Sequence, residues 1–191
     1  FDEKGLRWAR RVTEALDKKL YITLNTIVFE HEFKLLEEAL DFYEVLQPDA
    51  LIIQDLGVAA LIRQRKSKTP LHLSTQGAWF GQGGYLELND LNISRVILPR
   101  ELSRAEISQL RETFPELELE VFVHGAMCYS ISGRCFWSIA LGSRSGNRGT
   151  CAQPCRREYQ PNGKPELATC CFSPKDLRLI EQVGQLQNLG V

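Results

Sequence analysis

Six cysteines lie in the last third of the chain, and none lies in the first 127 residues. Six, fifteen and three residues separate Cys128, Cys135, Cys151 and Cys155, whereas Cys170 and Cys171 are adjacent. Four spaced thiolates suit a zinc ion or an iron–sulfur cluster. Incidental buried thiols and disulfides are the alternative interpretations. The spacing therefore predicts a local metal or cluster site without choosing the metal.

Arginines surround these cysteines. Residues 121–157 contain five Arg and no Asp or Glu, so they carry a charge of +5 in a chain whose net charge is −1. Guanidinium groups stabilise thiolates and bind phosphates or carboxylates. We therefore expect anion binding by Arg134, Arg144, Arg148 and Arg156. The Gly-rich stretch 143–149 could form an anion cradle, and a solvated surface loop is the alternative.

Motifs of hydrolases are mostly absent. The sequence has no G-x-S-x-G, and His31-Glu32 lacks the second His of a zinc peptidase because position 35 is Leu. His124 and Cys128 have the spacing of a base and a nucleophile. A cysteine that binds a cluster cannot also be a free nucleophile, so we disfavour a cysteine protease. We expect Phe136, Trp137 and Tyr159 to be core residues rather than base-stacking platforms.

Helical and extended patterns alternate along the chain. Strands are expected at 20–24, 49–53, 70–74, 95–98 and 117–123, with a short one at 168–172. Helices are expected at 2–18, 31–46, 56–65, weakly within 77–90, from Ser103 and from Ser173-Pro174. This alternation predicts an α/β fold, namely a partial TIM-like (β/α)₈ barrel lacking its first and last strands, with an irregular Cys-rich segment after the fifth strand. A doubly wound open sheet is the alternative.

Polar residues follow each expected strand. They are Asn25, Asp55, Gln76, Arg100 with Glu101, and His124. In a barrel these positions share the C-terminal mouth, where catalytic sites are built. Any single strand can end in a polar residue that has no functional role. The prediction of a site therefore rests on all of these residues together. We take Asp55, Gln76, Arg100 and His124 as candidate catalytic residues.

The composition fits one globular unit. Of the 191 residues, 43% are hydrophobic and 25% are charged, and no apolar run is long enough to span a membrane. We expect a single barrel fragment over residues 1–191, with a Cys/Arg-rich cluster-binding insertion at 124–171. The only methionine is Met127, so the chain is expected to be the middle of a longer, cytoplasmic protein.

Several segments together resemble peptidase family U32. The two cysteine blocks carry the resemblance most specifically, with FVHGAMC at 122–128, SGRC at 132–135 and SGNRGTCAQPCR at 145–156. Further matches are LSTQ at 73–76, LPRELS at 98–103 and SPKDL at 173–177. The resemblance covers nearly the whole chain, in order. It implies a TIM-barrel-like catalytic domain.

The resemblance also implies a chemistry. The family was named for collagenase-type proteolysis, but its better understood members are iron–sulfur hydroxylases that work without O₂ on RNA bases or on a ubiquinone precursor. Prephenate is the suspected oxygen donor. By motif match, Cys128, Cys135, Cys151 and Cys155 would hold a 4Fe–4S cluster, with zinc as the alternative. Some relatives take the fourth ligand from further downstream, which keeps Cys170 and Cys171 open, and a cluster can be lost from protein handled in air.

The sequence thus predicts an O₂-independent hydroxylase of an rRNA or tRNA base, similar above all to the ribosomal-RNA branch. Its partners would be RNA, a small carboxylate donor held by Arg residues and an electron-donor protein, with His124 moving protons. Two alternatives remain. One is a collagenase-like peptidase, and the other is a non-catalytic Cys₄ module that binds metal or RNA.

Overall fold

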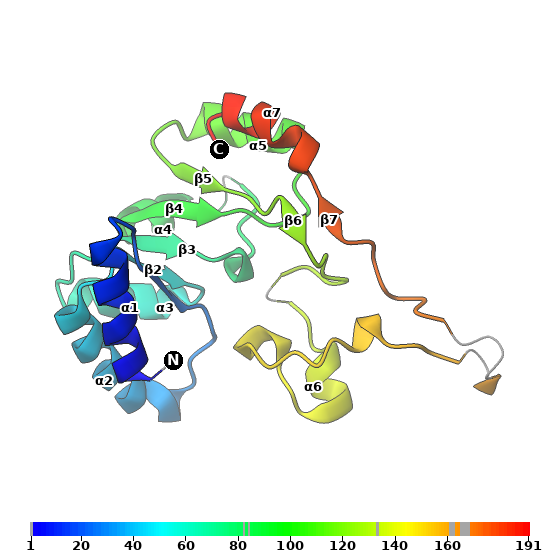
Figure 1. The fold of residues 1–191 in the computed structure, drawn as a ribbon, viewed down its shortest axis with the longest axis horizontal. Coiled ribbons are helices and arrows are strands. Elements are labelled where there is room, and N and C mark those ends of the chain that lie inside the picture. The colour runs from blue at the N-terminus through cyan, green and yellow to red at the C-terminus, as the bar shows by residue number, and fades with distance from the viewer. Residues whose placement is uncertain (1, 82, 84, 133, 161–162, 165–168) are drawn as a thin grey trace.

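A computed structural model describes residues 2–191 except 82, 84, 133, 161–162 and 165–168. Its five parallel strands form one sheet in the order β1-β2-β3-β4-β5 (Figure 1). The strands are β1 (Tyr21–Leu24), β2 (Ala50–Ile53), β3 (Leu71–Leu73), β4 (Ile93–Ile97) and β5 (Glu118–Glu120). The predicted α/β class and the five strands are confirmed. The strands lie in the sheet in the same order as in the chain, whereas the order in a doubly wound sheet reverses at a switch point.

Helices alternate with these strands. They are α1 (Glu3–Ala15), α2 (Phe33–Leu46), α3 (Leu56–Gln64), α4 (Tyr85–Asp90) and α5 (Arg104–Thr113). Local capping explains where three of them begin. The Asp2 carboxylate accepts the Gly5 N–H, the Asp55 carboxylate accepts the Gly57 N–H, and Ser103 opens α5 as expected from the sequence.

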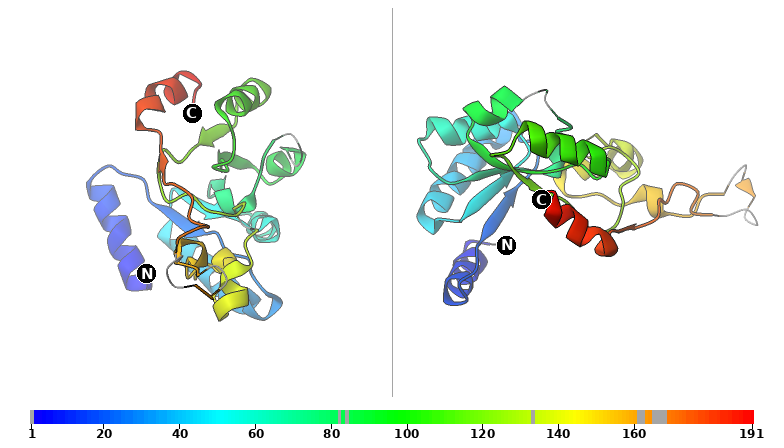
Figure 2. Two further views of the ribbon diagram at one scale, coloured as in Figure 1. Left: turned by 90° about the vertical axis from the view of Figure 1, so that its right-hand side faces the viewer. Right: turned by 90° about the horizontal axis from the view of Figure 1, so that it is seen from above.

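The hydrophobic core lies between the helices and one face of the sheet (Figure 2). Ile53, Leu71 and Val96 of the strands are fully enclosed, and they pack with Leu40 of α2 and Ile62 of α3. Because strand side chains alternate between faces, the intervening residues lie on the opposite face of the sheet.

That opposite face is polar around β3 and β4. The Arg95 guanidinium pairs with Glu118 at 2.8 Å and with Glu120 at 3.1 Å, and it lies over the Tyr21 ring. His72 packs edge-on against Tyr21 and is 4% exposed. Burial, together with the Arg95 charge, lowers the pKa of His72 to about 4. His72 is therefore neutral at pH 7.

The Cys-rich segment, residues 124–171, leaves the sheet at its C-terminal end and extends away from it (Figure 1). It contains β6 (His124–Gly125) and α6 (Trp137–Gly142), and β6 pairs antiparallel with β7 (Leu177–Arg178). α7 (Val183–Asn188) returns to lie beside α5, where Arg111 donates to the Gly190 carbonyl at 2.8 Å (Figure 2).

Three local predictions were wrong or incomplete. The fifth strand ends at Glu120 rather than 123, and His124 belongs to the separate β6–β7 pair. No helix begins at Ser173-Pro174, because Leu177 and Arg178 pair with β6, and α7 begins only at Val183. Of the expected strand at 168–172, residue 168 lies outside the described residues and Thr169 forms an isolated bridge with Tyr159.

None of the helices in the described part of the chain is long and apolar enough to cross a membrane.

Candidate functional site

One cavity of about 130 Å³ brings the four spaced cysteines together. Cys128, Cys135, Cys151 and Cys155 all line it, and so do Gln76 and Arg100 from the ends of β3 and β4. We call it the cysteine cavity. Cys170 and Cys171 are exposed and do not line it. The cavity is well below the roughly 300 Å³ at which typical small-molecule pockets begin, so it suits a compact group.

The thiols lie close enough to influence one another. Burial and the nearby Cys128 thiol raise the pKa of Cys155, and the Cys151 thiol acts in the same direction. The backbone N–H of Gln153 donates to Cys151 Sγ at 3.3 Å. Gln153 adopts a left-handed backbone conformation with a φ of 52°, as part of the tight turn between the last two of these cysteines.

No acidic side chain lines the cysteine cavity among the described residues. Besides the four cysteines, Gln76 and Arg100, the residues that line the cavity are Tyr129, Ser130, Ile131, Ser132, Trp137, Gly146, Asn147 and Pro154. Its polar groups are amides, hydroxyls and one guanidinium, which are all able to donate hydrogen bonds. Such a wall favours negative charge, including that of thiolates.

Gln76 and Arg100 are the two predicted catalytic residues on this wall. Gln76 lies just after the end of β3, and its backbone N–H donates to Ser74 Oγ at 3.2 Å. Its Oε1 is buried and has no hydrogen-bond partner within the described residues. Arg100 lies over the Phe122 ring at 4.1 Å and makes no ion pair with any described residue. Both side chains are therefore free to act on a group in the cavity.

Asp55 and His124, the other two candidates, do not line the cysteine cavity. The Asp55 carboxylate caps α3 through the Gly57 N–H at 2.8 Å, which is a structural role. His124 is exposed on β6, and no hydrogen bond joins it to Cys128 in the described part of the chain. The structure thus supplies no geometry for a His–Cys catalytic pair.

Arg148 fixes the Cys-rich segment to the loop between β1 and α2. It forms a two-pronged ion pair with Glu32, donates to the Ile27 carbonyl at 2.6 Å and lies over the Phe29 ring at 4.6 Å. The hydrogen bond from Arg148, with one from the Phe29 N–H, lowers the pKa of Glu32 to about 2. No pattern in the sequence marks Glu32 as this partner.

Arg156 fixes the other side of the segment. It pairs with Asp176 at 2.9 Å and donates to the Met127 carbonyl at 3.1 Å and to Ser173 Oγ at 3.3 Å. Arg144 donates to the Thr150 carbonyl, and Arg134 is exposed. Of the four predicted anion-binding arginines, two are thus already engaged by carboxylates of the protein.

Four aromatic rings pack beside the cavity. Tyr129, Trp137, Tyr159 and Phe172 lie with neighbouring ring centres 4.9–5.9 Å apart. Trp137 and Tyr159 are half-buried in this aromatic group and are not part of the hydrophobic core, so the expectation that they are core residues was wrong. The expectation for Phe136 was wrong, because its side chain is 70% exposed at the start of α6.

The four spaced thiols fit an iron–sulfur cluster better than a single zinc ion. Within the described ranges, no three His, Cys, Asp or Glu side chains are grouped so as to hold a metal ion. A structural zinc site needs its four ligands converging on one ion. Thiols spread around a cavity fit a cluster better, because its thiolates bind separate iron atoms. The donor set, the wall and the hydrogen bond to Cys151 Sγ all suit such a cluster.

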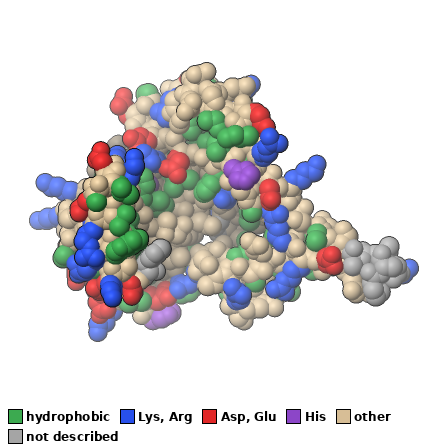
Figure 3. Space-filling model, viewed as in Figure 1, with side chains coloured by type: hydrophobic (Ala, Val, Ile, Leu, Met, Phe, Trp, Pro, Cys, Tyr) green, Lys and Arg blue, Asp and Glu red, His purple; other side chains and the backbone are tan. Residues whose placement is uncertain are grey.

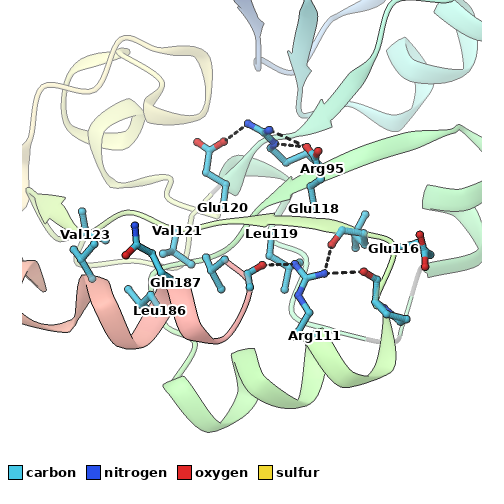
Figure 4. Close-up of a pocket in the computed structure, with 15 residues that line it drawn as sticks. Arg95, Arg111, Glu116, Glu118, Leu119, Glu120, Val121, Val123, Leu186 and Gln187 are labelled. Carbon is cyan, nitrogen blue, oxygen red and sulfur yellow. Dashed lines mark hydrogen bonds and ion pairs between the residues drawn. The ribbon is translucent and has the colours of Figure 1, made fainter.

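A larger cavity of about 600 Å³ lies between β5 and α7 (Figure 4). Four of the five charged side chains that line it have partners among the described residues, Glu116 being the exception: Arg95 pairs with Glu118 and Glu120, and Arg111 donates to the carbonyls of Pro115, Leu117 and Gly190. No cysteine lines it. It therefore offers little to a charged or redox-active ligand. Figure 3 shows instead a hollow between the sheet and the Cys-rich segment.

Sequence reasoning also missed Ser132 and Asn147, which are buried on the cavity wall. Neither belongs to a periodic pattern, and their place inside the two cysteine blocks that resemble family U32 is the signal that could have singled them out.

Comparisons with known proteins identify the family of the chain. The model of peptidase family U32 matches residues 1–191. The chain is 37% identical over 185 residues to tRNA hydroxylation protein P of Helicobacter pylori (strain ATCC 700392 / 26695), which covers 90% of this chain and 44% of that protein. It is 35% identical to the 23S rRNA 5-hydroxycytidine C2501 synthase of Escherichia coli K12, in a match that covers 90% of this chain and 25% of that protein. It is 30% identical to the collagenase of Porphyromonas gingivalis W83, in a match that covers 91% of this chain and 45% of that protein.

The chain spans less than half the length of these relatives. Among solved structures it is similar to the U32 peptidase Mk0906, with a TM-score of 0.58, 14% identity and coverage of 91% of this chain and 68% of that one. That likeness concerns the fold alone. From the match over its whole length, the chain belongs to peptidase family U32.

Proposed function

We propose that this chain carries the cluster-binding site of an O₂-independent iron–sulfur hydroxylase that acts on a base of tRNA or rRNA. One observation carries the proposal: the four spaced cysteines, Gln76 and Arg100 line one cavity although they come from distant parts of the chain. The names of the relatives from Helicobacter pylori and Escherichia coli, which concern tRNA and rRNA hydroxylation, support it.

In this proposal Cys128, Cys135, Cys151 and Cys155 hold a 4Fe–4S cluster. When bound, the cluster supplies redox-active iron next to the oxygen donor. Cys155, rather than Cys170 or Cys171, is the fourth ligand, because it alone of the three lines the cavity. The Gln153 N–H stabilises the charge on Cys151 Sγ through its hydrogen bond.

Arg100 binds a carboxylate of the oxygen donor, for which prephenate is our candidate. Its guanidinium is on the wall and has no carboxylate partner within the described residues. The buried, unpaired Oε1 of Gln76 orients the donor by accepting a hydrogen bond from one of its hydroxyl groups. A guanidinium and an amide together select an anionic, oxygen-rich molecule over a neutral one.

The remaining arginines divide into two groups. Arg134 and Arg144, both exposed, are available to RNA phosphates. Arg148 and Arg156 instead hold the Cys-rich segment through Glu32 and Asp176, so we revise their predicted role. His124 remains our candidate for moving protons at the surface, and an electron-donor protein would reduce the cluster.

The sheet would be part of a TIM-like barrel. Five consecutive parallel strands in chain order are the arrangement of a barrel, and Gln76 and Arg100 stand at the C-terminal ends of β3 and β4 where barrel sites form. The Cys-rich segment would then close the mouth of the barrel.

A peptidase is the second candidate, supported by the collagenase relative. No geometry among the described residues favours it, since His124 does not line the cavity that the four spaced thiols line.

Mass spectrometry of nucleosides tests the proposal. The protein is purified without oxygen and incubated with RNA, a reductant and prephenate. We expect an RNA nucleoside heavier by one oxygen, which disappears in Arg100→Ala, is reduced in Arg134→Ala and is unchanged in the control Cys171→Ala, at an exposed residue off the cavity. Gelatin cleavage by metal-free protein, without any modified nucleoside, would favour the peptidase instead.

A further inference from the structure

Two buried polar side chains on the cavity wall have no role in the proposal above. Ser132 is 4% exposed and Asn147 is 6% exposed, and both line the cysteine cavity. Ser132 lies between Cys128 and Cys135, whereas Asn147 precedes Cys151, so the pair joins the two cysteine blocks. Buried polar side chains are normally hydrogen-bonded. Two of them on one small wall therefore point to an acceptor in the cavity.

Their hydrogen-bond donors have no protein partner among the described residues. Asn147 Oδ1 accepts the Cys135 N–H at 3.3 Å, which fixes the carboxamide and leaves its amino group unused. The Ser132 hydroxyl makes no hydrogen bond to a described residue. Neither donor is among the fully enclosed unpaired atoms of the described part of the chain. Both groups are therefore accessible on residues that line the cavity.

The acceptor that fits these donors is sulfur. The wall carries no carboxylate within the described ranges, and the four thiols are the groups that become negative when they bind metal. One hydrogen bond of this kind already exists, from the Gln153 N–H to Cys151 Sγ. Hydrogen bonds to the sulfurs of an iron–sulfur cluster favour its reduced, more negative state and so raise its reduction potential.

We propose that Ser132 and Asn147 donate hydrogen bonds to the sulfurs of the bound cluster and raise its reduction potential. The inference rests on the proposed cluster and adds two residues that set its electron affinity. Such tuning would allow a mild cellular reductant to load the cluster with an electron.

The test is a redox titration of the anaerobically purified protein, followed by electron paramagnetic resonance, with iron content measured in parallel. Ser132→Ala removes only the hydroxyl, and Ser132→Thr restores it. Asn147→Asp keeps the oxygen that accepts the Cys135 N–H but replaces the donor by a charge. Ser143→Ala, which removes an exposed hydroxyl of the same segment, is the control.

We expect a more negative midpoint potential for Ser132→Ala and a larger shift for Asn147→Asp, with wild-type iron content in both. Ser132→Thr and Ser143→Ala should match the wild type. Unchanged potentials in Ser132→Ala and Asn147→Asp would overturn the inference alone. Loss of iron from both Ser132 variants would also overturn it, because Thr retains the hydroxyl. A wild-type protein without a cluster would instead overturn the proposed function first.

Discussion

Residues 2–120 and the Cys-rich segment hold their shapes in different ways. In the first region Ile53, Leu71 and Val96 are fully enclosed in an apolar core. In the second, the buried side chains of the described residues are three polar ones and a proline: Ser132, Ser138, Asn147 and Pro154. Apolar burial stabilises the sheet, whereas individual hydrogen bonds, ion pairs and a half-buried group of aromatic rings organise the segment.

Single hydrogen bonds and ion pairs connect the parts of the Cys-rich segment to one another and to the rest of the protein. Ser138 Oγ accepts the Ala152 N–H at 2.9 Å, Asn147 holds Cys135, and Arg148 and Arg156 attach the segment at its two sides. A region with few buried apolar contacts lies at the low-stability end of a protein. Metal binding commonly supplies folding free energy to such regions. We therefore expect the segment, and not the sheet, to depend on a bound cluster.

Loss of one thiol should have the largest effect on the segment. Cys135→Ala should reduce iron to background and hydroxylation below detection, because one ligand of the cluster is gone. The sheet should keep its far-ultraviolet circular dichroism. Cys171→Ala is the matched control, since Cys171 is exposed and off the cavity wall, and it should keep its iron. Iron loss in both variants would contradict the assignment of the ligands.

Shortening a side chain of the hydrophobic core should instead destabilise the sheet. Leu71→Ala should lower the free energy of unfolding of the sheet by about 2–5 kcal/mol, measured by urea denaturation, because it leaves a cavity in a packed core. Leu35→Ala, at a side chain 69% exposed on α2, should change it by less than about 0.5 kcal/mol. Equal effects of the two variants would mean that the core is not where we place it.

Acid should weaken the sheet through His72. Its pKa is about 4 in the folded protein, below the ordinary value of 6.5, so the unfolded chain binds the proton first. The stabilising contribution is complete above pH 6.5 and is lost as the pH falls towards 4. The loss is about 3 kcal/mol. The surrounding groups are Tyr21, Arg95, Glu118 and Lys19.

His72→Phe should flatten this part of the stability curve when urea midpoints are measured between pH 7 and pH 4. His31→Gln, at an exposed histidine, should leave the curve unchanged. A wild-type curve that is already flat would show that His72 is not buried as described.

The smallest effect should come from the ion pair that attaches the segment. Arg148→Lys keeps the charge but loses the two-pronged contact with Glu32, so amide hydrogen exchange should accelerate in residues 143–151 and stay unchanged in β1–β5. Arg144→Lys, which loses one hydrogen bond to Thr150, is the control. Because the pKa of Glu32 is about 2, below its ordinary value, the wild-type pair should persist down to about pH 4 and weaken as the pH falls towards 2. Faster exchange throughout the sheet would contradict a local role.

The two regions also differ in how far the sequence predicts them. Apolar periodicity located β1 to β5, and the residue types at strand ends selected Gln76 and Arg100, because regular elements repeat a simple pattern. The partners of Arg148 and Arg156 could not be predicted, since Glu32 is 116 residues away from Arg148. The β6–β7 pairing overrode the Ser173-Pro174 helix signal for the same reason, because contacts between distant residues leave no local pattern.

Metal analysis of the protein purified without oxygen tests whether the four spaced cysteines hold an iron–sulfur cluster. We expect iron and acid-labile sulfide in equal amounts, about four of each per chain, with the broad visible absorption of such a cluster. A colourless protein with one zinc per chain, or with no metal at all, would contradict it.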